Sequence, residues 1–334
     1  MDFDRTSITD VAREAGVSVT TVSHAFSGNR HVNAETVARI REVAERLAYQ
    51  PSQAATSLKL GTARAIAILV PDLASHFYVE LAVSVERVAH KRGYSLILCN
   101  SEFDDALEED YLALIQRQAI DGLVYASGSA AGREILERAA PFPVALIAGG
   151  SNVSAPVIVG ADHRGGGRSV GTHLRDLGHT RALVISAPTD YVSSDERAAG
   201  FAEAFQGSIL TVEGDYRRDS GANAVAARHP KVYDYTAVFA LNDMMALGAI
   251  GALRQMGLRV PSDVSVVGFD DIPTADLMNP ALTTVHQPAA TVGTYAADKL
   301  LDLLDKPETA AIDPMLVPVH LVVRESSGPV DESL

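Results

Sequence analysis

The feature that most constrains the fold is a regular alternation that begins near Ala65. Apolar segments of strand length alternate with amphipathic segments of helix length. Strands that are apolar throughout are typical of a parallel sheet covered by helices on both faces. About ten such strands are more than one doubly wound sheet of modest size contains, so we expect two lobes. The apolar segments include IAILVP, SLILCN, GLVYAS, VALIAG, RALVIS, AVFALND and VSVVGFD, and the expected helices cover 78–92, 107–118, 132–139, 166–177, 195–206 and 244–256.

The N-terminal segment follows a different pattern, which predicts three short helices. Ser7 precedes the first as an N-cap with Asp10 three residues on, and Gly16 ends it at a position that favours a residue without Cβ. Ser18 caps the second helix, and Asn33 caps the third. A helix, a tight glycine turn, a second helix and a supporting helix form a helix-turn-helix unit, which places its second helix in the DNA major groove.

The charge distribution separates this segment from the rest of the chain. Residues 1–61 hold seven Lys or Arg and seven Asp or Glu, which cancel. The remainder holds 21 cationic and 35 anionic residues and so carries the whole net charge of −14. An acidic body repels the DNA backbone, so only the N-terminal segment is expected to touch DNA.

Composition narrows the class further. Cys99 is the only cysteine of the 334 residues, which excludes an internal disulfide and any metal site built from several cysteines. The apolar runs are too short to span a bilayer, and the start MDFDRTSITD lacks the basic and apolar regions of a secretory signal. We therefore expect a cytoplasmic protein that has no membrane partner.

Candidate ligand contacts follow the strands, because ligands of open α/β sheets bind beyond the carboxyl ends of the strands. Carboxylates, amides, an arginine and aromatic rings at these positions suit the hydroxyls and flat faces of a sugar. Asn242 and Asp243 could instead organise loops, and Phe77 and Tyr216 could simply pack. The predicted contacts are Phe77, Tyr78, Asp162, His163, Tyr191, Ser193, Arg197, Tyr216, Asn242, Asp243 and Asp270.

Enzymatic chemistry has little support in the sequence. Gly165-Gly166-Gly167 lacks the Lys-Ser/Thr of a phosphate-binding loop, so it is interpreted as a helix start crowded against a strand. The histidines show no metal-ligand spacing, and no nucleophile–base pair or cofactor loop stands out. We predict no enzyme activity, no catalytic residue, no metal and no cofactor.

Long motifs resemble the LacI/GalR family of bacterial transcription regulators. They include ITDVAREAGVSVTTVSHAFSG, TVARIREVAERLAYQPS, AATSLKLGTARAIAILVPD, NDMMALGAIGALRQMGLRVPSDVSVVGFDD and PALTTVHQP, and they cover nearly the whole chain in the family's order. The resemblance implies a helix-turn-helix headpiece, a hinge helix and a core like a periplasmic sugar-binding protein. It also implies a homodimer on a palindromic operator, most often a repressor that a small metabolite releases or recruits.

The resemblance sets the expected domain boundaries. The DNA-binding domain covers 1–50, the hinge helix and linker 51–62, and the ligand-binding core 63–334. Within the core, lobe 1 is expected at about 63–161 and 291–321, and lobe 2 at about 162–290 and 322–330. The last residues, SSGPVDESL, are expected to form a loose tail, and they lack the leucine heptad of tetrameric relatives.

The resemblance also implies which residues contact DNA. Val19, Thr20 and His24 take the base-reading positions, although many relatives carry Arg in place of His24. Leu58 is the hinge leucine that wedges into the minor groove. Thr56 stands where Arg is common, which lowers the affinity expected of the hinge. The remaining predicted DNA contacts are Ser7, Ser18, Thr21, Ser23, Asn29, Arg30, Ala55 and Lys59.

For the effector, the resemblance makes Arg197 and Asp270 the strongest contacts. Tyr191 stands where purine-sensing relatives carry a positive residue, which favours a sugar or sugar derivative over a nucleobase. Three alternatives stay open. They are a solute-binding protein for transport, an enzyme on a Rossmann-like sheet, and a regulator that activates transcription or responds to another kind of effector.

Overall fold

The computed structural model describes residues 6–27, 30–49, 62–117, 120–126, 142–147, 155–187, 191–230, 235–306 and 314–330. The chain divides into two compact units, Met1–Ala63 and Arg64–Leu334, which we name the headpiece and the core. The predicted hinge contacts Ala55, Leu58 and Lys59 lie outside the described residues, as do Asn29 and the expected helix 132–139.

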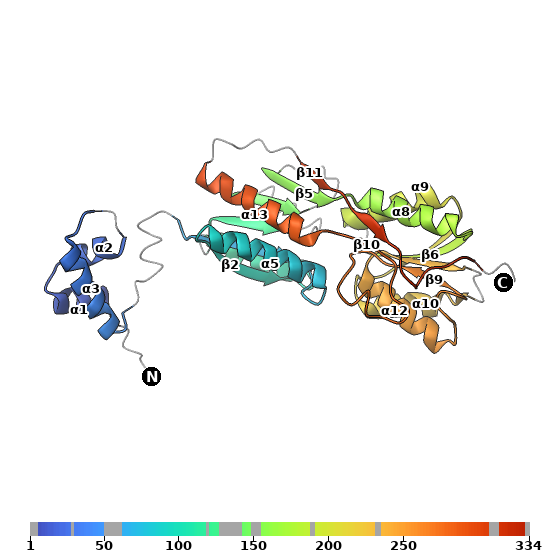
Figure 1. Ribbon diagram of the computed structural model, residues 1–334, viewed down its shortest axis with the longest axis horizontal. Helices are drawn as coiled ribbons and strands as arrows, with labels where there is room; N and C mark the ends of the chain where they lie inside the picture. Colours follow the sequence, from blue (N-terminus) through green and yellow to red (C-terminus); the bar gives the residue numbers. More distant parts are fainter. Residues whose placement is uncertain are drawn as a thin grey trace. The chain divides into compact units, whose positions relative to one another are not determined.

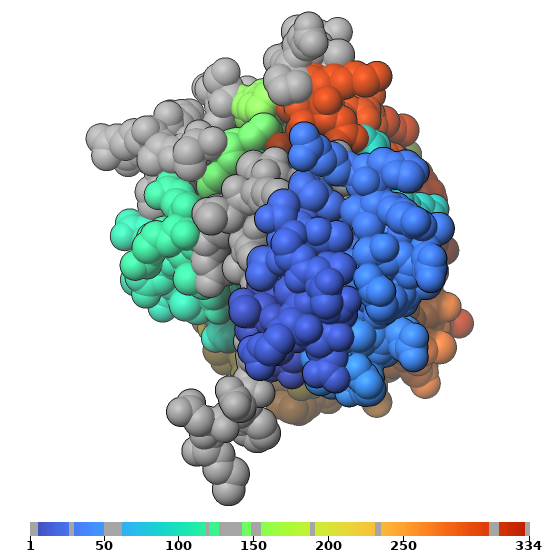
Figure 2. Space-filling model, turned by 90° about the vertical axis from the view of Figure 1, so that its left-hand side faces the viewer, coloured from blue at the N-terminus to red at the C-terminus, as the bar shows by residue number. Residues whose placement is uncertain are grey.

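The headpiece is a bundle of three helices, α1 (Ile8–Ala15), α2 (Val19–Ser27) and α3 (Ala34–Arg46). Ser7 and Asp10 form a capping box at the start of α1, and Gly16 ends that helix with a left-handed φ of 64°. Asn33 caps α3 by accepting a hydrogen bond from the Glu35 backbone. The helices form one closely packed body (Figure 2) around small apolar side chains, which are Val11, Ala12, Ala15, Val22, Ala25, Ile40, Val43 and Ala44.

Lobe 1 of the core is a six-stranded parallel sheet whose strand order is β11-β5-β4-β3-β1-β2 (Figure 1). Helices α5 (His76–Lys91) and α13 (Ala289–Asp305) pack on one face of this sheet, and α6 (Asp105–Arg117) packs on the other. Alternate residues of the strands serve the two faces, as the period of a strand requires. The strands are β1 (Ala65–Val70), β2 (Ser95–Asn100), β3 (Gly122–Tyr125), β4 (Val144–Ile147), β5 (Val157–Ala161) and β11 (Met315–Val317).

Lobe 2 repeats this plan with a four-stranded parallel sheet of order β7-β6-β8-β9. Helices α8 and α9 form one pair and α10 and α12 another, and Figure 1 shows the pairs on opposite faces of the sheet. The prediction of two lobes built on parallel sheets is therefore confirmed. The elements are β6 (Arg181–Ser186), β7 (Ser208–Glu213), β8 (Ala237–Ala240), β9 (Ser265–Val267), α8 (His163–Asp176), α9 (Val192–Phe205), α10 (Arg218–Ala227) and α12 (Asp243–Gln255).

In both sheets the first strand of the lobe lies between the second and the third. In lobe 1, β1 lies between β2 and β3, and in lobe 2, β6 lies between β7 and β8. This order creates a switch point beyond the carboxyl ends of the first and third strands, where ligands of such sheets bind. In lobe 1 the switch point lies beyond β1 and β3, and in lobe 2 beyond β6 and β8. Each sheet therefore has a position suited to ligand binding beyond the carboxyl ends of its first and third strands.

The chain crosses between the lobes after β5, after β10 (Thr284–His286) and before β12 (His320–Val322). Strands β10 and β12 pair antiparallel, with His286 opposite His320, and form a short ribbon of their own. The expected loose tail is wrong for residues 326–330. Ser326 is fully buried, donates to the Val266 carbonyl and accepts from the Thr283 N–H, because these backbone groups need partners at the sheet edge.

Most observed helices begin one to three residues before their predicted starts. Helix α8 begins at His163 because Asp162 caps it, and α12 begins at Asp243 because Asn242 caps it. The expected packing of Gly165–Gly167 against a strand is also corrected. A Cβ on Gly167 would overlap the backbone of Arg197 in α9, so this glycine permits the close approach of α8 and α9.

Candidate functional site

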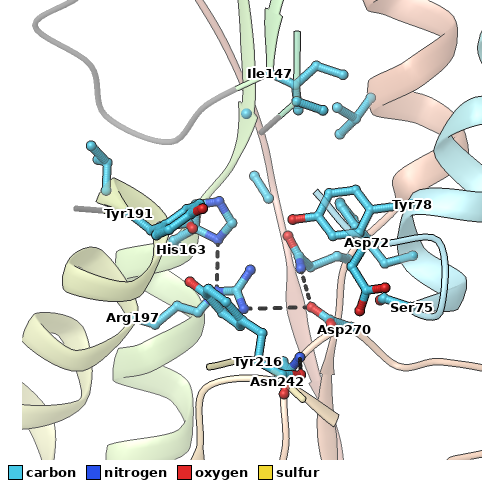
Figure 3. Close-up of a pocket in the computed structure, with 18 of the residues that line it drawn as sticks. Asp72, Ser75, Tyr78, Ile147, His163, Tyr191, Arg197, Tyr216, Asn242 and Asp270 are labelled. Carbon is cyan, nitrogen blue, oxygen red and sulfur yellow. Dashed lines mark hydrogen bonds and ion pairs between the residues drawn. The ribbon is translucent and has the colours of Figure 1, made fainter. Parts of the chain in front are cut away.

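A cavity of about 70 Å³ lies between the lobes, at the carboxyl ends of both sheets. Tyr78 and Ser75 reach it from lobe 1, while Arg197, Tyr216 and Asp270 reach it from lobe 2 (Figure 3). The structure brings together most of the predicted ligand contacts. Those that line the cavity are Phe77, Tyr78, His163, Tyr191, Ser193, Arg197, Tyr216, Asn242 and Asp270.

Arg197 is the centre of the lobe 2 wall. It is only 6% exposed, and its guanidinium lies 4.0 Å above the Phe269 ring. Its Nε donates to His163 Nδ1 at 3.2 Å, and its Nη1 donates to the Leu241 carbonyl. Among the described residues, Nη2 has no hydrogen-bond partner, which leaves this nitrogen available to a ligand.

His163 is held in one protonation state by this contact. Because Nδ1 accepts from Arg197, the ring proton is assigned to Nε2. Burial, together with the positive charge of Arg197, lowers the pKa of His163 well below its usual value. The site therefore contains a neutral imidazole.

Asp270 supplies the counter-charge. One of its carboxylate oxygens lies 3.7 Å from Arg197 Nη1 and accepts from Gln287 Nε2 at 2.6 Å. Burial raises the pKa of Asp270 to about 7, although the nearby guanidinium opposes this shift. Its φ of 126° is rare for a residue with a side chain, and such strained backbone is concentrated at functional sites. Figure 3 shows Arg197 between His163 and Asp270.

Asn242 lines the cavity, but its polar atoms are engaged in building it. Its Nδ2 donates to the Tyr216 carbonyl at 2.8 Å, and its Oδ1 accepts from the Met245 N–H at 2.9 Å. These bonds hold Tyr216 in a left-handed conformation with φ 65°. Asn242 is thus a positioning residue for the Tyr216 ring, in agreement with the loop-organising alternative.

Asp162 and Asp243 do not line the cavity. Asp162 accepts from the Gly165 N–H as the cap of α8. Asp243 is fully buried beneath the site, where it accepts from the Thr284 hydroxyl and from the Ile272 N–H at 2.9 Å. Burial raises the pKa of Asp243. These carboxylates hold the surrounding backbone in place, so the expectation of a ligand contact is corrected for both.

Several cavity residues were absent from the predicted set. Asp72 and Ser75 follow β1 within a loop that the strand-end rule selects, and Phe103 follows β2. Gln287 follows β10, a strand too short to register as an apolar segment. The sequence signal that could have identified Gln287 is that it is a polar residue two positions after the apolar Val285. The other additions are Ala126, Ile147, Gly160, Ala161, Val192 and Val292.

In the headpiece, the predicted base-reading residues lie on α2. Val19 is 41% exposed, Thr20 is exposed and His24 is half-buried. Ser18 accepts from the Thr21 N–H at 3.1 Å, so it caps the helix that carries them. Ser7 and Arg30 are exposed, and Thr21 and Ser23 are half-buried.

Within the segments that the structure describes, no three His, Cys, Asp or Glu side chains are placed to hold a metal ion. None of the described helices combines the length and hydropathy needed to cross a bilayer.

Family models and relatives match both units. The model for bacterial regulatory proteins of the lacI family matches residues 7–52, and the periplasmic binding protein-like domain matches 172–327. A relative named HTH-type transcriptional repressor PurR, from Edwardsiella ictaluri (strain 93-146), is 36% identical over 324 residues. That alignment covers 93% of this chain and 95% of the relative.

Solved structures are similar over the same span. The lac repressor dimer bound to operator and the anti-inducer ONPF has a TM-score of 0.82 at 28% identity, covering 97% of this chain and all of that one. A CelR–cellobiose complex scores 0.72 at 29% identity and covers 96% of this chain and all of that one. A LacI family regulator from Enterococcus faecalis V583 with bound ribose has a TM-score of 0.72 at 29% identity. That match covers 80% of this chain and all of the other. The chain therefore belongs to the LacI family and is a DNA-binding transcriptional repressor with an effector-binding domain.

Proposed function

We propose that the effector is a sugar or sugar derivative with a single ring, bound between the lobes. A cavity of about 70 Å³ is large enough for several water molecules, since one water needs roughly 10–15 Å³ by this measure. That space supports one ring rather than two. Relatives with bound ribose and with cellobiose make a saccharide a reasonable class.

The observation that carries this proposal is the pattern of open donors and acceptors. Gln287 is 3% exposed, and among the described residues its Oε1 has no hydrogen-bond partner. A buried acceptor without a donor is costly, so a ligand that donates to it is favoured. Arg197 Nη2 offers a donor nearby. A sugar hydroxyl both donates and accepts, and the Tyr78 and Tyr216 rings flank the same space.

For DNA binding, we propose that α2 reads base edges through Val19, Thr20 and His24. The exposure of Val19 and Thr20 supports this role, because their side chains are available to a groove. Phosphate contacts are proposed for the other described residues of the predicted set. They are Ser7, Ser18, Thr21, Ser23 and Arg30.

We propose a homodimer on a palindromic operator. Strand β2 is the outer strand of its sheet and exposes Leu98, and α5, which packs beside it, exposes Val83. Exposed apolar side chains at a sheet edge favour association with a second chain. The lac repressor relative is itself a dimer bound to its operator. A repressor of this kind acts in the cytoplasm, where the operator lies.

The proposed coupling runs through the linker at 51–62, which lies mostly outside the described residues. A ligand that changes the angle between the lobes changes the separation of the two linkers in a dimer, and with it operator affinity. Leu58→Gly should weaken operator binding strongly and leave sugar binding nearly intact, because it removes the proposed minor-groove wedge. Unchanged operator affinity would show that the wedge is not used.

A thermal-shift screen of the full-length protein tests the effector class. Sugars and sugar derivatives are compared with nucleobases and amino acids, and the best ligand is then added to operator binding on duplexes selected from a random pool. We expect a monosaccharide to raise the melting temperature and to change operator affinity, whose direction separates an inducer from a corepressor. A nucleobase or an amino acid as the strongest ligand overturns the sugar proposal, and turnover of the sugar overturns a purely regulatory role.

A further inference from the structure

A contact across the cleft joins the two lobes beside the cavity. Phe103, in the turn after β2 of lobe 1, stacks on Tyr216 of lobe 2 with ring centroids 5.5 Å apart and planes 16° apart. It also meets Tyr191 of lobe 2 edge-on, at 5.8 Å. Tyr191 and Tyr216 contact each other at 5.8 Å, so the three rings form one cluster. All three rings line the cavity.

The neighbouring residue adds a polar contact between the same lobes. The Nη2 of Arg217, in lobe 2, donates to the Glu102 carbonyl of lobe 1 at 2.9 Å. Glu102 and Phe103 are consecutive, as are Tyr216 and Arg217. Two adjacent pairs of residues therefore bind each other, one by ring stacking and one by a hydrogen bond.

The backbone on both sides of this contact has an unfavourable conformation. Glu102, Phe103 and Tyr216 have φ values of 55°, 58° and 65°, which side chains other than glycine rarely adopt. The Asp104 N–H closes the lobe 1 turn by donating to the Ser101 carbonyl at 2.8 Å. Asn242 fixes Tyr216 from below. Hydrogen bonds therefore hold the backbone in this conformation on both sides of the contact.

We propose that Phe103 and Arg217 form a latch that closes the cleft before an effector binds, and that Phe103 competes with the effector for the Tyr216 ring. The stacked Phe103 already takes an aromatic contact that a ligand ring would use. An effector therefore has to displace Phe103, which makes this residue a gate and a determinant of specificity. The inference rests on the proposed role of the cleft as the effector site.

The first test uses the fact that the chain contains no tryptophan. In full-length Phe103→Trp, position 103 carries the sole indole, whose quenching by acrylamide reports its exposure. We expect weak quenching without ligand and an increase of at least about threefold when Tyr216→Ala removes the stacking partner. Arg217→Ala should give a smaller increase. Arg218→Ala is the matched control, because Arg218 has no hydrogen bond or ion pair to lobe 1 among the described residues.

If the indole is quenched as readily with Tyr216 as without it, the cleft is open in solution and the latch is wrong. A second measurement avoids any misfit of tryptophan. Hydrogen exchange is compared between the wild type and Phe103→Ala, a substitution in lobe 1. We expect exchange at residues 215–217 of lobe 2 to accelerate at least threefold, and unchanged exchange there would overturn the proposal.

The sugar screen separates failure of the latch from failure of the proposed function. A sugar that binds should raise acrylamide quenching of the residue 103 indole, because the ligand displaces it from Tyr216. A sugar that binds and leaves the quenching unchanged contradicts the gate. If no sugar binds either the wild type or Phe103→Ala, the proposed effector class is wrong, while the ligand-free quenching and exchange results still decide whether the latch exists.

Discussion

The headpiece and the core place their functional side chains in opposite environments. In the headpiece, the candidate DNA contacts Val19 and Thr20 are exposed on a helix whose cap, Ser18, is a sequence neighbour. In the core, Arg197 and Asp270 are buried and bonded to residues far away in the chain. Function and stability are therefore separable in the headpiece, whereas in the core the residues proposed to bind ligand also hold the structure together.

Arg197→Ala is the strongest test of this contrast. Removing one partner of a buried pair leaves the other charge uncompensated, at about 3–5 kcal/mol. We expect a large fall in the melting temperature of the core and loss of effector binding. Arg168→Ala, which removes an exposed arginine of α8, is the control and should change stability by less than about 1 kcal/mol. Equal effects of the two substitutions would contradict the central role of Arg197.

Ile40→Ala tests whether the headpiece folds as its own unit. Ile40 is fully buried in a core of mostly small side chains, so the truncation should cost about 2–5 kcal/mol. A small domain has little stability in reserve, so operator binding should be lost. Calorimetry should show an unchanged core transition, and the effector should still bind. A matching destabilisation of the core would show that the two units unfold together.

Thr20→Ala tests operator binding separately from the stability of the headpiece. Thr20 is exposed, so its replacement should leave the free energy of unfolding of the headpiece within about 0.5 kcal/mol of the wild type. A lost base contact should reduce specific operator affinity by about 1–3 kcal/mol. Thr9→Ala, an exposed threonine of α1, serves as the control in the same binding assay. If both variants bind the operator equally well, Thr20 does not read a base.

The pH dependence of stability should reveal the buried carboxyl Asp243. Its pKa is raised by burial above the ordinary value of about 3.9, so the folded chain retains a proton that the unfolded chain releases. The contribution of Asp243 to the free energy of unfolding therefore falls as pH rises from about 4 through the raised pKa. The total fall is about 1.4 kcal/mol for each pH unit between the unfolded and folded pKa values. Burial also raises the pKa of Asp270, which acts in the same sense as Asp243. Buried His163 and His179 and half-buried His173 have lowered pKa values and act in the opposite sense below about pH 6.5.

The difference between the wild type and Asp243→Asn isolates the carboxyl from these histidines. The melting temperature of the wild type relative to the variant should fall between pH 4 and pH 7, across the raised Asp243 pKa of about 6. A relative stability that stays constant or rises over this interval would mean that Asp243 is ionised throughout.

Much of the cleft was predictable because the carboxyl ends of parallel strands converge on one edge of a sheet. That rule selected Tyr78, Tyr191 and Arg197 without any knowledge of their partners. It could not exclude Asp162 or Asp243, since a carboxylate that follows a strand can equally cap a helix or bond to backbone N–H groups beneath the site. It also did not select Gln287, whose place in the cavity depends on where the chain crosses between the lobes.

The sequence by itself determined the features that depend on residues a few positions apart. Ser7 with Asp10, and Asn33 with Glu35, specify helix starts through hydrogen bonds within one turn, and the apolar period specifies the strands. Only the tertiary structure decided the contacts between distant segments. The pairs Arg197–His163 and Phe103–Tyr216 arise from the packing of two helices and the meeting of two lobes. Such contacts depend on how distant segments pack in the folded chain, which a local sequence pattern does not specify.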